Sequence, residues 1–414
     1  MLSLSQFACG LTAEVAFDVL AVAKRLKAAG KDVIELQIGD SPFPTTKSAV
    51  AAGIDAINHG ATHYCASPGL PQFRETLSAN YTREFGLKIG PENVVVGPGA
   101  KIFQQYFCEA FIDPGDAVLL FSPQFATYEP NILRRGATPV YAPLKQENQF
   151  RPDLNDVEHF LKSEPKAKAI FLNSPHNPTG GVATEDDLRG LADLIRGRPI
   201  ALFSDEPYCH MVWSGKHHTP LAQPGMMEQT LAAYTFSKSY SMSGWRLGYA
   251  VGSPAVVDAI AKMINTSLSC VPPLVQVAGR AAILNDAAER NKVMRKFHAK
   301  VELLVADLRK VDGVKVLMPA GTFYVFPEVS EICRRLKIRS HGLAMFLLEA
   351  ADDKKGVACL GGECFGTAGQ GYLRFSCAEP DDRLIAAVKF LAEAVTRTDR
   401  VAKYLEAHPE YRLQ

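Results

Sequence analysis

The chain has 414 residues, of which 47% are hydrophobic and 21% are charged, and its formal net charge is +1. This is the composition of an ordinary globular protein. A nearly neutral chain gives no reason to expect nucleic acid or an anionic membrane surface as a partner. At about 150 residues per domain, the length predicts two or three domains.

The cysteines and the N-terminal residues indicate a cytoplasmic protein. Nine cysteines are an odd number, and without dense spacing they fit reduced thiols better than a disulfide framework. Cys359 and Cys364 have no second Cys or His pair at zinc spacing, so we expect buried thiols and no metal. Glu14 and Asp18 interrupt the apolar character of the N-terminus, so we expect no signal peptide. No stretch approaches the ~18 continuous apolar residues of a membrane-spanning helix.

In chain order, the first predicted element is an amphipathic helix at 12–29, with Thr12 as its N-cap and Gly30 as its stop. The stretch "IELQIGD" (34–40) is read as extended. From residue 92 onward, short apolar runs alternate with helical patterns, which is typical of a mostly parallel sheet with helices on both faces. The runs predict seven strands, at 93–97, 117–121, 138–144, 169–173, 199–204, 231–236 and 247–251. Only about ten residues separate the last two, too few for a parallel crossover, so we expect the last strand to be antiparallel.

After about residue 290 the pattern changes to a long amphipathic helix, short runs at 314–318, 322–327 and 371–377, and further helices. This pattern predicts a smaller α+β domain. The predicted division is an N-terminal arm and helix at 1–45 that joins the small domain, a large α/β domain at 46–290, and the small domain at 291–414.

Polar and aromatic residues follow the carboxyl ends of the predicted strands, where ligands bind in open α/β sheets. In strand order they are Gly99, Ala100 and Lys101 at a strand-to-helix turn, then Phe125, Asn177, Asp205 with Tyr208, and Lys238. A glycine-bearing turn offers free backbone N–H groups to a phosphate. Each residue alone could be a turn residue, an N-cap, a core aromatic or a surface charge. Together they predict a site for pyridoxal phosphate, with Lys238 forming the Schiff base and Asp205 pairing with the ring nitrogen.

The segments "NSPHNPTG", "SDEPY", "TFSKSYSMSGWRLGY" and "GYLRFSC" resemble those of the class I/II aminotransferases of fold type I, the aspartate aminotransferase superfamily. The resemblance extends from about "IELQIGD" to the last helix. It implies a fold type I pyridoxal-phosphate-dependent transferase. The cofactor would lie in the large domain, and a homodimer would have its active sites at the interface.

The resemblance also implies a role for each matching residue. The catalytic residues would be Lys238, Asp205 and Tyr208, where Tyr208 and Asn177 hydrogen-bond to the 3′-oxygen of the ring and Phe125 stacks on it. The positions at or beside the cofactor phosphate are Gly99, Ala100, Lys101, Thr235, Ser237 and Arg246, together with Tyr64 reaching across from the neighbouring subunit. The α-carboxylate of the substrate would be bound by Arg374 and the backbone of Gly39, beside Asn177.

Several positions depart from the commonest family pattern. Thr235 replaces a serine, Ser174 a proline, and Phe125 the tryptophan of many members that act on acidic substrates. In one aspartate-specific subgroup, a lysine at the Lys101 position and a threonine in the first helix bind the distal carboxylate. Here Ala16 and Phe17 stand around that threonine position, so only half of the pattern is present.

The resemblance therefore implies transfer of an amino group from an L-amino acid to a 2-oxo acid, with aspartate and 2-oxoglutarate as one candidate pair. The alternative is a same-fold enzyme of another reaction type, namely a β-lyase, a decarboxylase or an arginine-type oxidase or cyclase, because fold does not fix reaction. A cofactor-sensing regulator would need an N-terminal DNA-binding domain, for which the chain has no room. A nicotinamide dehydrogenase is disfavoured because Ile102 stands where its glycine fingerprint needs the third Gly.

Overall fold

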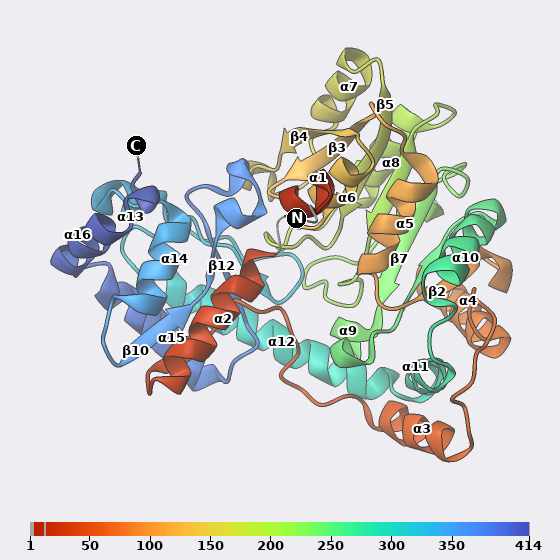
Figure 1. Ribbon diagram of the computed structural model, residues 1–414, viewed down its shortest axis with the longest axis horizontal. Helices are drawn as coiled ribbons and strands as arrows, with labels where there is room; N and C mark the ends of the chain where they lie inside the picture. The colour runs from red at the N-terminus through yellow and green to blue at the C-terminus, as the bar shows by residue number, and fades with distance from the viewer. Residues whose placement is uncertain (1–3, 12–13, 414) are drawn as a thin grey trace.

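A computed structural model describes residues 4–11 and 14–413 (Figure 1). Its largest feature is a seven-stranded sheet with the order β2-β8-β7-β6-β5-β3-β4. The strands are β2 (Val94–Gly97), β3 (Ala117–Ser122), β4 (Thr138–Pro143), β5 (Ala167–Asn173), β6 (Ala201–Asp205), β7 (Thr230–Thr235) and β8 (Gly248–Val251). Each of the seven predicted strands is therefore present, within two residues at either end. Strand β8 pairs antiparallel with β2 and β7, as predicted, and the other pairs are parallel.

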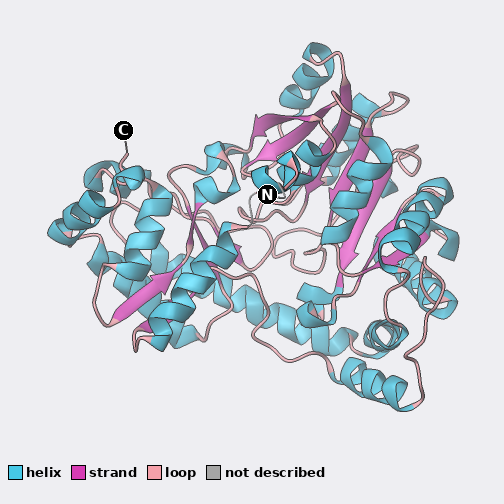
Figure 2. Cartoon of the chain, in the orientation of Figure 1, coloured by secondary structure: helices cyan, strands magenta, loops and turns pink. Residues whose placement is uncertain are grey.

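Helices cover both faces of this sheet (Figure 2). Successive strand residues point to opposite faces, so on β3 Val118 joins one apolar cluster while Leu119 joins another. The first face packs on α5, α6 and α10, and the second on α4, α7, α8 and α11. These helices are α4 (Pro71–Phe85), α5 (Lys101–Phe111), α6 (Tyr128–Arg134), α7 (Leu154–Ser163), α8 (Glu185–Ile195), α10 (Pro254–Leu268) and α11 (Pro273–Asn285). Burial on both faces explains why the strands are almost uniformly apolar.

A second apolar core combines the two ends of the chain. Val19 and Leu36 pack in one cluster with Phe346 and Leu391. Its sheets are β1 (Asp32–Glu35) parallel to β10 (Lys355–Ala358), and an antiparallel set of β11 (Leu360–Gly361), β12 (Leu373–Ser376) and β9 (Tyr324–Val325). Its helices are α2 (Val15–Ala28), α12 (Ala287–Leu308), α13 (Ser330–Leu336), α14 (Ser340–Glu349), α15 (Asp381–Ala394) and α16 (Thr398–Ala407). In Figure 1, α12 runs from this core toward the large sheet.

Two details differ from the sequence-based expectations. The first helix spans Val15–Ala28, and the predicted N-cap Thr12 lies outside the described residues. The apolar run at 314–318 forms only an isolated bridge, between Lys315 and Glu328, because no neighbouring strand continues the pairing.

Three further helices complete the described chain: α1 (Gln6–Gly10), α3 (Lys47–Asn58) and α9 (Phe236–Ser239). Among the residues that the structure describes, none of the helices is long and apolar enough to cross a membrane. Nor do the described ranges contain a group of three or more His, Cys, Asp or Glu side chains placed to hold a metal ion.

The central position of β6 allows a test of the fold. Leu202 in β6 is fully buried, whereas Leu133 on α6 is 52% exposed. We expect Leu202→Ala to lower the free energy of unfolding by about 2–5 kcal/mol, because it removes buried methyl groups and leaves a cavity. The matched Leu133→Ala should change it by about 0.5 kcal/mol or less. Urea unfolding of both variants measures this, and equal effects would contradict the central placement of β6.

Candidate active site

A cavity of about 470 Å³ lies at the carboxyl ends of the parallel strands, between the large sheet and the second core. Parallel strands bring their carboxyl ends to one edge, so residues far apart in the sequence meet there. Of the predicted site residues, twelve line it: Gly39, Ala100, Lys101, Phe125, Asn177, Asp205, Tyr208, Thr235, Ser237, Lys238, Arg246 and Arg374. Gly99 does not line the cavity itself but lies against the Arg246 guanidinium, which does. Tyr64 is 86% exposed and does not line the cavity of its own chain.

Lys238 is placed by the way strand β7 ends. Thr235 is the last residue of β7 and caps the four-residue helix α9, since its hydroxyl accepts a hydrogen bond from the N–H of Ser237 at 3.2 Å. The Lys238 ammonium enters the cavity and donates to the backbone carbonyl of Gly39 at 2.5 Å. The Nζ atom also lies 5.8 Å from the ring centre of Phe323. The amine thus lines the cavity and is hydrogen-bonded to a carbonyl of the N-terminal segment.

Asp205 ends the central strand β6 and is 4% exposed. Its Oδ2 accepts hydrogen bonds from the Tyr128 hydroxyl at 2.6 Å and the Gln104 amide at 3.4 Å, whereas its Oδ1 is buried without a partner among the described residues. Burial raises the pKa of Asp205 from 3.8 to about 6, although the two hydrogen bonds act in the opposite direction. A buried carboxylate oxygen without a donor is costly, so this oxygen is suited to a cationic N–H group in the cavity.

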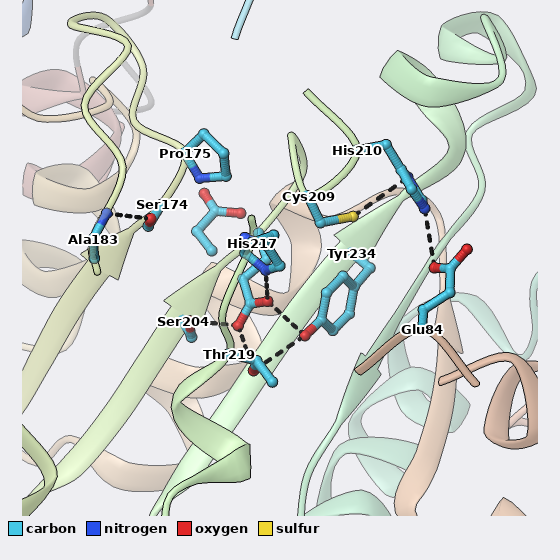
Figure 3. A network of polar contacts seen from close by, with 12 residues as sticks. Glu84, Ser174, Pro175, Ala183, Ser204, Cys209, His210, His217, Thr219 and Tyr234 are labelled. Atoms are coloured by element: carbon cyan, nitrogen blue, oxygen red, sulfur yellow. Dashed lines mark hydrogen bonds and ion pairs between the residues drawn. The ribbon is translucent and has the colours of Figure 1, made fainter. Parts of the chain in front are cut away.

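The neighbouring residue Glu206 shows the contrast. It is fully buried and does not line the cavity. It accepts hydrogen bonds from Ser204, Thr219, Tyr234 and His217 at 2.6–2.8 Å. Figure 3 shows these four donors converging from separate segments. Because these donors satisfy Glu206, it needs no ligand, whereas Asp205 presents to the cavity an oxygen without a hydrogen-bond donor in the described ranges.

Arg374 approaches the cavity from the other core, on β12. It is 4% exposed, and it donates to Asn177 Oδ1 at 3.1 Å and to the carbonyl of Gln37 at 2.5 Å. The rings of Tyr324 and Phe365 lie 4.4 and 4.9 Å from its Cζ. Its Nε is buried without an acceptor in the described part of the chain. A buried guanidinium with an unused N–H group is well suited to bind a carboxylate.

The phenol of Tyr208 closes this side of the cavity. Its hydroxyl lies 3.2 Å from that of Tyr324, and burial raises the pKa of Tyr208 well above its ordinary value of 10. Tyr208 therefore stays a neutral hydrogen-bond donor. Gly39 faces the same phenol pair, since a side chain at Gly39 would coincide with the Tyr324 hydroxyl.

A cradle for an anion lies where α5 begins. Gly99 adopts a φ of +88°, and a Cβ there would be 2.7 Å from Nη2 of Arg246. Arg246 itself donates to the carbonyls of Ser243 and Pro98 at 2.7 and 3.1 Å. The hydroxyls of Thr235 and Ser237 lie 2.9 Å apart beside it. Backbone N–H groups at a helix N-terminus, hydroxyls and a guanidinium are the groups that commonly bind phosphate in proteins. The unpartnered Asp205 oxygen, the amine of Lys238 and this cradle together fit pyridoxal phosphate.

Two residues that build the site were not predicted. Tyr128 and Gln104 hold Asp205, and each comes from a helix other than the strand that it supports, so no local pattern marks it. The only local signal for Tyr128 is its position three residues after Phe125. Glu14, at the start of the predicted first helix, and Tyr324, in the predicted run 322–327, also line the cavity.

Comparison with known proteins identifies the class. The family model for aminotransferase class I and II matches residues 31–389. A probable aspartate/prephenate aminotransferase of Aquifex aeolicus is 35% identical over 91% of this chain and 94% of its own length. An asparagine–oxo-acid transaminase of Streptococcus mutans is 30% identical over 88% and 93%. The structure of Thermus thermophilus aspartate aminotransferase with maleate superposes with a TM-score of 0.88, at 31% identity, over 95% of this chain and all of that one.

The chain therefore belongs to the class I and II aminotransferase family, and its fold is the α/β fold type I of these enzymes. The predicted family, fold and enzyme class are confirmed. The relatives are named for amino-group transfer, which favours transamination over the β-lyase, decarboxylase and oxidase or cyclase alternatives.

The raised pKa of Asp205 generates a prediction for the cofactor-free protein. The unfolded carboxyl titrates near 3.8 and the folded one near 6. Below pH 3.8 the carboxyl is protonated in both states, and its contribution to the free energy of unfolding is fully present. This contribution is lost as the pH rises through about 6, because folding must then bury a charged carboxylate. Asp205→Asn keeps an acceptor for Tyr128 and removes the charge. We expect it to stabilise the cofactor-free protein at pH 8 by about 1–3 kcal/mol.

The gain should shrink toward zero below pH 4, and urea unfolding at several pH values measures it. Asp258→Asn changes an exposed carboxylate on α10 and serves as the control. A gain for Asp205→Asn that does not depend on pH would show that Asp205 is not a strained buried acid.

Proposed function

We propose that this aminotransferase uses pyridoxal 5′-phosphate to move an amino group from an L-amino acid to a 2-oxo acid. The observation that carries the proposal is that one cavity contains both the amine of Lys238 and a buried carboxylate oxygen of Asp205 without a donor among the described residues. When bound, the cofactor supplies an electrophilic aldehyde carbon and an electron sink.

The chain's own residues would hold the cofactor at four places. Asp205 would accept the N–H of the ring nitrogen and keep that nitrogen protonated, since a buried anion favours a cation beside it. Phe125 would lie against the ring, and Tyr208 and Asn177 would hydrogen-bond to the ring oxygen. The phosphate would be bound by the backbone at Gly99, Ala100 and Lys101 and by the side chains of Thr235, Ser237 and Arg246, which leaves the Lys101 ammonium free of this task.

Lys238 and Arg374 would act on the substrate. Arg374 binds the α-carboxylate, with Gly39 and Asn177 beside it, and thereby turns the substrate Cα toward the amine of Lys238. Lys238 is the attachment point of the cofactor. With its amine free, Lys238 would take the proton from the substrate Cα and return it as a general base and acid.

We further propose a cytoplasmic homodimer. The 86% exposed side chain of Tyr64 supports this, because the family resemblance assigns it to the cavity of a neighbouring subunit. Ile54 and Ile57 on α3 are also more than half exposed and would be covered by a partner. The buried thiols of Cys333 and Cys359 fit a reducing compartment.

The same proposal keeps the domain division predicted from the sequence, with residues 46–290 as the cofactor domain. The packing of residues near both ends of the chain in one apolar core supports the joining of residues 1–45 to residues 291–414. Arg374 and Gly39 would then belong to one unit, and Asp205 and Lys238 to the other.

The experiment that tests the proposal is a half-reaction. The purified holoenzyme is mixed with single L-amino acids without a 2-oxo acid, and the cofactor absorbance is followed. A transaminase converts its cofactor once and then stops until a 2-oxo acid is added. Continuous product release without an acceptor would instead support a lyase or a decarboxylase.

Replacement of the amine tests the role of Lys238. We expect Lys238→Ala to lower the rate of this half-reaction by at least about 100-fold, because the proton acceptor at Cα is removed. Borohydride followed by mass spectrometry should no longer find the cofactor attached to the chain. Lys292→Ala, at an exposed lysine on α12, is the control. Full turnover and a trapped adduct in Lys238→Ala would refute the assignment.

A further inference from the structure

Six charged side chains line the cavity in the described part of the chain: Glu14, Lys101, Asp205, Lys238, Arg246 and Arg374. Under the proposed function, Asp205 and Arg246 serve the cofactor, Lys238 the chemistry, and Arg374 the substrate α-carboxylate. The charged groups left for the side chain of a substrate are then Glu14 and Lys101. Their arrangement decides which side chains the cavity accepts.

Glu14 and Lys101 are paired with each other. The Lys101 ammonium contacts Oε1 of Glu14, across 87 positions of sequence, and lies 5.3 Å from the ring centre of Phe125. The Glu14 side chain is only 17% exposed, whereas that of Lys101 is 47% exposed. The carboxylate is thus turned inward from the start of α2, against the lysine. Apolar groups of Ala16, Phe17 and Ile38 line the cavity around this pair.

We propose that Glu14 is a specificity-determining residue that selects against amino acids with a distal carboxylate and in favour of those with an uncharged side chain. A distal carboxylate that reaches Lys101 must either lie beside Glu14, a like charge, or displace it and leave Glu14 half-buried without its partner. An uncharged substrate side chain leaves the Glu14–Lys101 pair intact and contacts the apolar groups around it. This inference rests on the proposed function and assigns its substrate class.

L-Asparagine and L-aspartate provide the test, because they have nearly the same shape and differ in charge. Single half-reactions of the holoenzyme give kcat/KM for each donor. We expect the wild-type protein to prefer L-asparagine, and Glu14→Gln to shift the ratio toward L-aspartate by about two- to fivefold, the effect of one partly exposed charge contact. Glu158→Gln breaks a comparable Glu–Lys pair, with Lys162 at 2.8 Å on α7, and should leave the ratio unchanged. An unchanged ratio in Glu14→Gln would overturn the inference.

A binding measurement gives a second readout that needs no turnover. Isothermal titration of the holoenzyme with succinate and with its uncharged-end analogue succinamate should show succinate binding about two- to fivefold more tightly to Glu14→Gln than to the wild-type protein. The affinity for succinamate should change less. Equal changes for both ligands would show that Glu14 acts on shape and not on charge, which overturns the inference.

The two failures can be told apart. If the wild-type holoenzyme converts its cofactor with L-asparagine or other amino acids but prefers L-aspartate, the specificity inference fails and the proposed function stands. If no amino acid changes the cofactor absorbance of the wild-type holoenzyme, the proposed function itself fails, and the role of Glu14 fails with it.

Discussion

The buried carboxylate of Asp205 is the constraint on which the rest of the site depends. It ends the central strand of a sheet that is covered on both faces, where an isolated charge is costly. Tyr128 and Gln104 satisfy one of its oxygens and leave the other unpartnered. Glu206, one residue later, has four donors and is complete. Asp205 Oδ1 is therefore a buried acceptor that faces the cavity without a donor from the described part of the chain, and a protonated ring nitrogen is the group that the proposed function places beside it.

The two cores of the molecule supply different halves of the chemistry. The large sheet provides Asp205, Lys238 and the phosphate cradle, whose positions follow from the parallel strands that end at one edge. The second core provides Arg374 and Gly39, and the contact of Lys238 with the Gly39 carbonyl joins the two. A substrate held by its α-carboxylate at Arg374 is therefore fixed relative to the amine only while the two cores keep their present arrangement.

The strands of the large sheet and the residues at their carboxyl ends could be predicted from the sequence, because both depend on local patterns of apolar residues. Apolar runs mark strands that are buried on both faces, and a residue that follows such a run, such as Asp205 or Lys238, must lie at the carboxyl edge. The short link before β8 predicted its antiparallel direction. The support of Asp205 by Tyr128 and Gln104 and the pairing of Glu14 with Lys101 could not be predicted, since tertiary packing brings these residues together from different elements. The pairing of Glu14 matters for substrate choice. From the sequence, Lys101 matched a residue that binds a distal carboxylate, but in the structure this lysine is already paired with Glu14.

The central claim is that Asp205 holds a proton on the ring nitrogen of the cofactor. The most direct measurement is ¹⁵N NMR of holoenzyme reconstituted with pyridoxal phosphate labelled at that nitrogen. The account predicts a chemical shift of the protonated form that persists to a pH at which the free cofactor has lost the proton, and its loss in Asp205→Asn. A nitrogen that titrates as in the free cofactor, or that keeps its proton in Asp205→Asn, would contradict the account.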